Sequence, residues 1–231
     1  MHLQIHLLLD SFDLARKEEN IMAVDSAQLI KIINHMAQYI EENKDFLTEL
    51  DAAIGDADHG INMAKGFKAV SEKISSMEDK DCGTILKTVG MTLVSTVGGA
   101  SGPLYGTAFM RASQATGTKD KITFEDLPTI LDAALEGIKM RGKAQKGEKT
   151  IIDSLEPAVK VLKSSSPADL DLLKKAVDAA KDGVEYTKGI IAKKGRASYL
   201  GERSIGHQDP GATSCYIMLK AIYDALENMQ K

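Results

Sequence analysis

The sequence contains few of the residues that cross-link a chain or anchor it in a membrane. Only two cysteines, Cys82 and Cys215, occur in 231 residues. Because they are far apart and belong to no C-x-x-C pair, they argue against a disulfide framework and a structural zinc site. The apolar run at residues 7–9 has no Lys or Arg before it and ends at Asp10, so it is a poor signal peptide and too short to span a bilayer. We therefore expect a cytoplasmic protein with no membrane partner.

The chain also lacks an excess of charge of one sign. Its 29 basic and 33 acidic residues are mixed along the sequence and give a formal net charge of −4. No basic stripe is available for nucleic acid, so an anionic ligand must be held locally. Hydrophobic residues make up 43% of the chain, and no Pro-, Gly- or Ser-rich linker divides it. This composition supports a sizeable core.

From Asp25 onward, apolar residues recur at the three- and four-residue spacing of amphipathic helices. Only residues 91–97 have a strand-like composition, and one such run without a partner does not make a sheet. We therefore predict an all-α fold of about eight antiparallel helices in an up-and-down bundle or barrel. The apolar stripes cover residues 29–40, 63–74, 85–93, 104–115, 127–138, 152–162, 170–191 and 218–229.

Glycine is concentrated in four connections, at residues 55–60, 98–106, 142–147 and 195–211, which follow the first, third, fifth and seventh stripes. Connections after odd-numbered helices of an up-and-down bundle all emerge at the same end. Function is usually carried by such loops on a rigid scaffold. We therefore predict one site, assembled from these four connections at one end of the bundle.

The first of these connections contains a cluster of carboxylates. Asp51, Asp56 and Asp58 fall within eight residues. Mg²⁺ takes one or two carboxylates and completes its octahedron with water and substrate phosphate, so this set suits Mg²⁺ shared with a polyphosphate. The same spacing is about equally typical of a solvent-exposed turn whose aspartates cap a helix. A calcium loop of the EF-hand type would need glycine and glutamate where the chain has Ile61 and Phe67.

The second connection offers a phosphate-binding loop. The backbone N–H groups of Gly99, Ala100, Ser101 and Gly102 are little shielded by side chains, and a helix with Pro103 in its first turn follows directly. Such a helix start binds phosphate, and the Ser101 hydroxyl adds a donor. Close packing of helices through small residues is the alternative.

The remaining two connections contain basic side chains. Residues 142–150 resemble a P-loop, but Glu148 stands where the lysine must be and a helix precedes the loop, so the P-loop fold is excluded. This loop could still line a nucleotide site, or its lysines could simply be exposed to solvent. Residues 193–211 form the longest irregular connection, and long ordered loops are usually functional. Arg196 suits a bidentate phosphate contact, while Asp209 suits a ligand contact or a helix N-cap ahead of proline.

Three motifs together resemble the nucleotide-binding L-subunit family of dihydroxyacetone kinases. They are Gly-Asp-Ala-Asp-His-Gly at 55–60, Gly-Gly-Ala-Ser-Gly-Pro at 98–103, and the run from Gly195 to Gly211. The resemblance extends from about Met22 to the C-terminus. It implies an eight-helix antiparallel barrel with ADP and two Mg²⁺ at one mouth. It also implies that residues 21–231 form the nucleotide-binding domain and that residues 1–20 are an N-terminal extension outside it.

The resemblance also implies a set of site residues. Asp51, Asp56 and Asp58 would be the Mg²⁺ ligands, and no nucleophile is expected on this chain. The implied nucleotide contacts are His59, Gly60, Ile61, Asn62, Gly99, Ala100, Ser101, Gly142, Ile151, Arg196, Asp209, Pro210 and Gly211.

In the branch of this family coupled to the bacterial phosphotransferase system, ADP is a resident cofactor that cycles with ATP. The resemblance implies that a phosphohistidine donor subunit (M) phosphorylates the bound ADP, and that the ATP formed phosphorylates dihydroxyacetone held on a separate subunit (K). A chain of 231 residues leaves no room for a substrate domain, which favours this branch. Two alternatives stay open: an ATP-dependent kinase subunit with exchangeable nucleotide for another small polyol or acyl substrate, and a non-enzymatic nucleotide-sensing adaptor that binds a transcriptional regulator.

Overall fold

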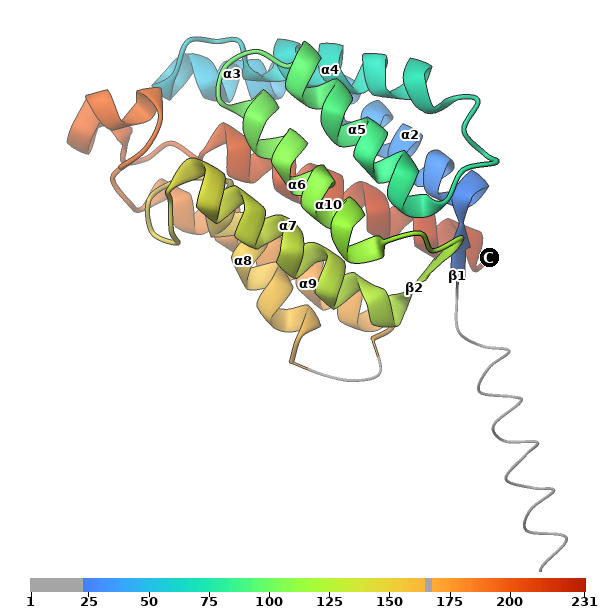
Figure 1. Cartoon of the computed structure of the whole chain (residues 1–231). Helices are drawn as coiled ribbons and strands as arrows, with labels where there is room; N and C mark the ends of the chain where they lie inside the picture. The colour runs from blue at the N-terminus through green and yellow to red at the C-terminus, as the bar shows by residue number, and fades with distance from the viewer. Residues whose placement is uncertain (1–22, 165–167) are drawn as a thin grey trace, which may run out of the picture.

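The structure is a computed structural model that describes residues 23–164 and 168–231. The expected N-terminal extension, residues 1–20, lies outside the described residues. Helices dominate, with one two-stranded antiparallel sheet (Figure 1), which confirms the predicted all-α class. The elements are β1 (Ala23–Asp25), α2 (Ser26–Glu42), α3 (Lys44–Ile54), α4 (His59–Ile74), α5 (Cys82–Thr96), α6 (Ser101–Thr116), β2 (Lys121–Thr123), the 3-10 helix η1 (Phe124–Asp126), α7 (Leu127–Gly142), α8 (Ile151–Leu162), α9 (Leu170–Lys188), the 3-10 helix η2 (Arg196–Ser204) and α10 (Pro210–Met229).

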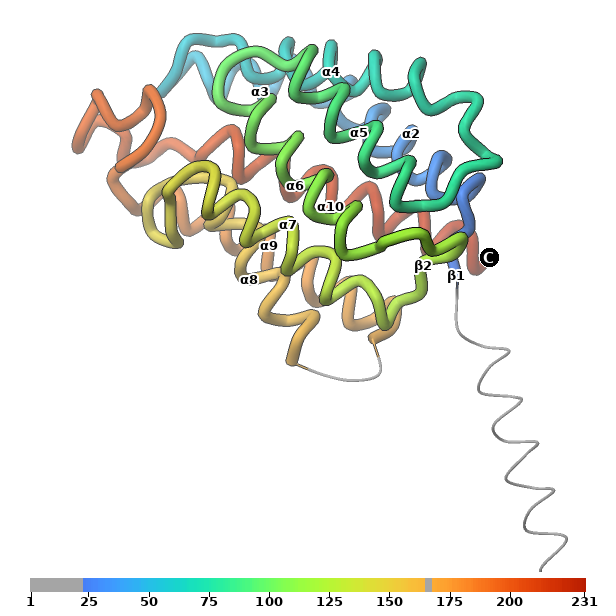
Figure 2. The backbone as a smooth tube through the Cα atoms, viewed as in Figure 1, coloured from blue at the N-terminus to red at the C-terminus, as the bar shows by residue number. Residues whose placement is uncertain are grey.

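In the described ranges, eight of the helices pack in sequence order around a closed circuit. Helix α2 contacts α4, each helix from α4 to α10 contacts the next, and α10 returns to α2. Figure 2 shows α5, α6 and α7 running side by side with alternating direction. Helix α3 is a ninth helix that the apolar stripes did not predict. It starts one residue after α2 ends, with only Asn43 between them, so no loop composition announces it.

Capping and burial explain why these segments are helical. At the start of α2, the Asp25 carboxylate accepts the Gln28 N–H at 2.9 Å, and the Gln28 side chain accepts the Asp25 N–H at 3.0 Å. A capping box of this kind stabilises a helix by about 1 kcal/mol. The strand-like run at 91–97 lies mostly within α5, because Leu93 is fully buried at a helical spacing from Val89.

The small sheet closes the end of the molecule away from η2 (Figure 1). Strand β1 pairs antiparallel with β2, so that Ala23 faces Thr123 and Asp25 faces Lys121. The pairing joins the start of α2 to the connection between α6 and α7. Three-residue strands carry no alternation pattern, so the sequence did not predict this sheet.

The interior is apolar. Phe67, Ile33 and Met63 are fully buried, and Phe67 meets Phe109 edge-on at 6.4 Å between ring centroids. A cavity of about 160 Å³ remains between α2, α6, α7, α8 and α10, and its lining is almost entirely hydrophobic. Among the described residues, no helix is both long and apolar enough to cross a bilayer.

Candidate functional site

A larger cavity, of about 390 Å³, opens at the end of the bundle from which η2 projects (Figure 1). All four glycine-rich connections contribute to its wall: Asp56 from the first, Ser101 from the second, Gly142 from the third and Arg196 from the fourth. The predicted convergence of these connections at one end is therefore confirmed. The site is therefore formed by four connections at helix ends and not by a single loop.

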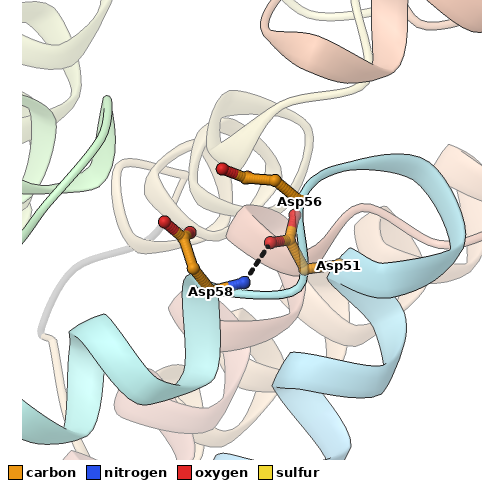
Figure 3. Close-up of side chains that lie close together, drawn as sticks. All are labelled: Asp51, Asp56 and Asp58. Atoms are coloured by element: carbon orange, nitrogen blue, oxygen red, sulfur yellow. Dashed lines mark hydrogen bonds between the residues drawn. The ribbon is translucent and has the colours of Figure 1, made fainter.

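The three aspartates lie together in the wall of this cavity (Figure 3). One carboxylate oxygen from each lies within 4.8 Å of the others. Asp51 belongs to the last turn of α3, and its Oδ2 accepts the N–H of Asp58 at 2.9 Å and of His59 at 3.2 Å. Asp51 thus satisfies the first amide donors of α4, and the Asp58 side chain makes no capping hydrogen bond. The Asp58 carboxylate is therefore free to bind a cation.

The donor set fits Mg²⁺. All the clustered ligand atoms are carboxylate oxygens, which is the chemistry that hard divalent cations require. Asp51 is 8% exposed and fixed by two amides, so it offers a ligand that is already oriented. The Arg196 guanidinium lies 2.9 Å from Asp56 at the rim, where it places positive charge beside the acidic cluster.

The loop predicted to bind phosphate, residues 98–101, lies directly ahead of a helix, as the sequence predicts. Helix α6 starts at Ser101, and Pro103 is in its first turn. Gly99 has φ +65°, a conformation that favours glycine, while a Cβ there would meet no atom within 4 Å. The glycine is therefore needed for the backbone turn and not for packing. That turn leaves the amides ahead of α6 at the cavity wall.

His59 lies between two serines and contributes no charge. Its Nδ1 is 3.0 Å from Ser101 Oγ, its Nε2 is 2.9 Å from Ser214 Oγ, and the residue is 7% exposed. Burial lowers the pKa of His59 to about 4, outweighing the opposing effects of the Asp51 charge and the Pro210 backbone. The imidazole is therefore neutral at pH 7, and it reaches the phosphate loop through the Ser101 hydroxyl.

Three of the predicted nucleotide contacts lie outside the cavity wall: Gly60, Ile61 and Asn62. A Cβ at Gly60 would lie 2.0 Å from the Lys44 carbonyl oxygen, so this glycine allows α4 to approach α3. Ile61 is 53% exposed, and the Asn62 side chain borders Gly98, supporting the phosphate loop from outside the cavity. The other predicted site residues line the cavity: Asp51, Asp56, Asp58, His59, Gly99, Ala100, Ser101, Gly142, Ile151, Arg196, Asp209, Pro210 and Gly211.

Comparison with known proteins identifies the family. Residues 53–224 match the family model described as the DAK2 domain. The chain belongs to the DAK2 domain family. This DAK2 domain chain is 46% identical over 204 residues to the "PEP-dependent dihydroxyacetone kinase, ADP-binding subunit DhaL" of Escherichia coli K12, covering 87% of this chain and 97% of the relative.

Two further similarities agree with this family. The "PTS-dependent dihydroxyacetone kinase, ADP-binding subunit DhaL" of Lactococcus lactis is 44% identical over 200 residues, covering 85% of this chain and 96% of the relative. The dihydroxyacetone kinase of C. freundii in complex with AMP-PNP and Mg²⁺ superposes with a TM-score of 0.65 at 28% identity, over 86% of this chain and 34% of that chain. The predicted resemblance to dihydroxyacetone kinase L subunits is therefore confirmed.

The DAK2 domain also contains a buried lysine that sequence reasoning missed. Lys149 is 1% exposed, and its Nζ donates to the carbonyl oxygens of Thr187 at 2.6 Å, Ser204 at 2.7 Å and Ile190 at 3.2 Å. Lys149 also adopts φ +61°, which a non-glycine residue rarely does. It ties the start of α8 to the end of α9 and to η2. The loop composition gave no signal, because the three acceptors are backbone atoms from distant segments.

Two carboxylates fix the segments near Lys149 in the DAK2 domain: the buried Asp153 and the partly buried Asp209. Asp153 is fully buried and accepts the N–H groups of Gly147 at 2.5 Å and Thr150 at 2.8 Å, which fixes the loop before α8. Asp209 accepts the Ala212 N–H at 2.7 Å, so the predicted N-cap of α10 is confirmed. Burial raises the pKa of Asp209 to about 7, partly offset by the hydrogen bond from Ala212.

We expect His59 to make the DAK2 domain sensitive to acid. Its pKa is about 4 in the folded protein but near 6.5 in the unfolded chain, so the stability from its neutral form is fully present above pH 6.5 and is lost as the pH falls towards 4. At pH 5 this loss amounts to about 2 kcal/mol. Urea unfolding at pH 7.5 and pH 5 should therefore show a larger loss in the wild type than in His59→Gln. The exposed His207→Gln variant should follow the wild type, and equal losses in all three proteins would contradict the burial of a neutral ring.

Proposed function

We propose that this chain is the ADP-binding subunit of a phosphoenolpyruvate-dependent dihydroxyacetone kinase. ADP held in the larger cavity accepts a phosphoryl group from a phosphohistidine donor subunit (M), and the ATP formed phosphorylates dihydroxyacetone on a separate substrate-binding subunit (K). The observation that carries the proposal is the meeting of the aspartate cluster, the phosphate loop and Arg196 in one cavity. It occurs in a chain that spans 97% of an ADP-binding relative.

The acidic side of the cavity would hold two Mg²⁺ through Asp51, Asp56 and Asp58. When bound, the metal ions would offset the negative charge that develops during phosphoryl transfer. Asp51 provides a fixed ligand because the amides of Asp58 and His59 orient it, while Asp58 provides a ligand that no capping bond restrains. The chain needs no nucleophile, because positioning and charge stabilisation carry this class of reaction.

The opposite wall would hold the nucleotide. Amides of the segment Gly99 to Ser101 and the Ser101 hydroxyl donate to phosphate oxygens, and Arg196 adds positive charge at the rim. Ile151, which is 5% exposed, offers an apolar surface to the adenine ring. Gly142 and the start of α10 at Pro210 complete the enclosure.

We also propose how the chain is organised. Residues 21–231 form one nucleotide-binding domain, with residues 1–20 as an extension ahead of it. ADP stays tightly bound and cycles with ATP, and the complex of the three subunits works in the cytoplasm. The family match to residues 53–224 and the single circuit of helices support one domain.

Nucleotide and Mg²⁺ content of the extensively dialysed protein tests this function. We expect close to one ADP and two Mg²⁺ per chain after denaturation, measured by chromatography and metal analysis. Addition of a phosphorylated donor subunit should then convert the bound ADP to ATP. An empty protein that takes up and releases ATP would instead support the ATP-dependent alternative. Binding without transfer from any donor would support the nucleotide-sensing adaptor with a transcriptional regulator as partner, and failure to bind nucleotide would reject the site.

A further inference from the structure

Four side chains form a continuous line of hydrogen bonds from the phosphate loop into the interior. Ser101 Oγ is 3.0 Å from His59 Nδ1, His59 Nε2 is 2.9 Å from Ser214 Oγ, and Ser214 Oγ is 2.7 Å from the Tyr105 hydroxyl. Three of the four are buried: Ser214 is 0% exposed, Tyr105 4% and His59 7%. Bulk water is therefore kept from these three groups, and their hydrogen bonds must be satisfied within the protein.

The direction of the hydrogen bonds along this line matters. A neutral imidazole has one donor nitrogen and one acceptor nitrogen, and each hydroxyl has a single hydrogen to donate. If the hydrogen is on Nδ1, His59 donates to Ser101, and the Ser101 hydrogen is left for the cavity. If it is on Nε2, the Ser101 hydroxyl donates to His59 and offers a phosphate only oxygen lone pairs.

Ser214 and Tyr105, at the inner end of the line, can support the arrangement in which His59 carries its hydrogen on Nδ1 and donates to Ser101. The shortest contact, at 2.7 Å, joins Ser214 to Tyr105, and a phenol is a better donor than a serine hydroxyl. Tyr105 then donates to Ser214, and Ser214 donates to Nε2 of His59. Both hydroxyls also lie 3.1 Å from the Gly211 carbonyl oxygen, which is a longer contact that competes for their hydrogens. The Pro210 backbone, which also acts on His59, is a competing acceptor for the imidazole hydrogen.

A bound phosphate would favour one of these hydrogen-bond arrangements over the others. A phosphate oxygen is a charged acceptor, and hydrogen bonds to charged acceptors are about twice as strong as those between neutral groups. Donation from Ser101 to phosphate requires His59 to donate to Ser101 through Nδ1. We propose that Tyr105 and Ser214 are positioning residues that hold His59 as the Nδ1–H tautomer in the nucleotide-bound protein, so that Ser101 donates to a phosphate oxygen. This inference rests on the proposed nucleotide site.

The ring nitrogens of His59 test the inference directly. In ¹⁵N-histidine-labelled protein saturated with ADP and Mg²⁺, long-range ¹H–¹⁵N correlation spectra distinguish Nδ1–H, Nε2–H and doubly protonated rings. The sequence has five histidines, and the signal lost in His59→Gln assigns this one. We expect the Nδ1–H pattern. An Nε2–H or doubly protonated ring in the ADP-bound protein would overturn the inference while leaving the nucleotide site intact.

Variants of the inner residues provide the second test. Ser214→Ala removes the donor to Nε2, so we expect the Nδ1–H signal to be lost and the ADP dissociation constant to rise about tenfold. Tyr105→Phe removes only the phenol hydroxyl and should give a smaller change in the same direction. Ser214→Thr keeps a hydroxyl and should restore both readouts, and the matched buried serine variant Ser154→Ala should change neither.

These readouts separate the two proposals. A wild-type protein that binds no ADP would reject the nucleotide site itself. A protein that binds ADP, but in which Ser214→Ala and Tyr105→Phe leave both the tautomer and the dissociation constant unchanged, would reject only the positioning role.

Discussion

The Asp58→Ala variant is expected to lose bound nucleotide and to reduce phosphoryl transfer by about a thousandfold or more. The Asp58 side chain makes no capping hydrogen bond, and the amides of Asp58 and His59 donate to Asp51. The substitution therefore removes a metal ligand without removing support for the helix. ADP and Mg²⁺ content after dialysis, together with the rate of transfer to dihydroxyacetone, measures the effect. The Asp56→Ala variant should behave similarly, but it also breaks the ion pair with Arg196.

The control for this variant is Asp178→Ala, which removes an exposed aspartate of α9 and should change neither nucleotide content nor rate. Thermal unfolding of the metal-free proteins should give similar midpoints for the wild type and Asp58→Ala, because the residue has no structural bond to lose. An Asp58→Ala protein with full activity and normal Mg²⁺ dependence would reject Asp58 as a ligand.

The Lys149→Met variant should lower the free energy of unfolding by about 3 kcal/mol or more. The substitution leaves the carbonyl oxygens of Thr187, Ile190 and Ser204 without their charged donor, and the contacts to Thr187 and Ser204 are buried. Because burial already lowers the pKa of Lys149, part of the loss is recovered by removing a buried charge. Urea unfolding at pH 7.5 gives the stability, and amide hydrogen exchange over residues 187–206 should show the local opening.

Two variants make this result specific. Lys181→Met removes an exposed lysine of α9 and should stay within about 0.5 kcal/mol of the wild type. Lys149→Arg keeps the charge and should recover part of the stability. If Lys149→Met unfolds like the wild type and leaves exchange over residues 187–206 unchanged, the three hydrogen bonds are not important to the fold.

Much of this fold follows from local patterns in the sequence. Helical spacing of apolar residues predicts eight of the nine α-helices in the described residues, because each of these eight buries one continuous stripe. The position of the site follows from topology, since glycine-rich connections after alternate helices must share one end. The capping role of Asp209 follows from the proline after it.

The features that sequence reasoning missed depend on contacts between distant segments. Helix α3 follows α2 after a single residue, so no turn composition separates the two. The acceptors of Lys149 are backbone oxygens, which all residue types share and which composition therefore cannot reveal. Gly60 was assigned to the nucleotide, but close approach to the Lys44 carbonyl explains it equally well. Neighbouring residues in a motif can thus face different parts of the molecule, because a helix turns each successive side chain by about 100°.

Helix α10 fixes the distance between the larger cavity and the C-terminus. It starts at Pro210 beside the larger cavity and ends at Met229, near the C-terminus at the other end of the bundle (Figure 1). At about 1.5 Å per residue, its 20 residues span about 30 Å. A fluorophore on the C-terminus and a fluorescent nucleotide in the cavity would therefore lie at a separation suited to resonance energy transfer. Such a pair would report nucleotide release in real time and leave the mouth of the cavity open to a phosphoryl donor.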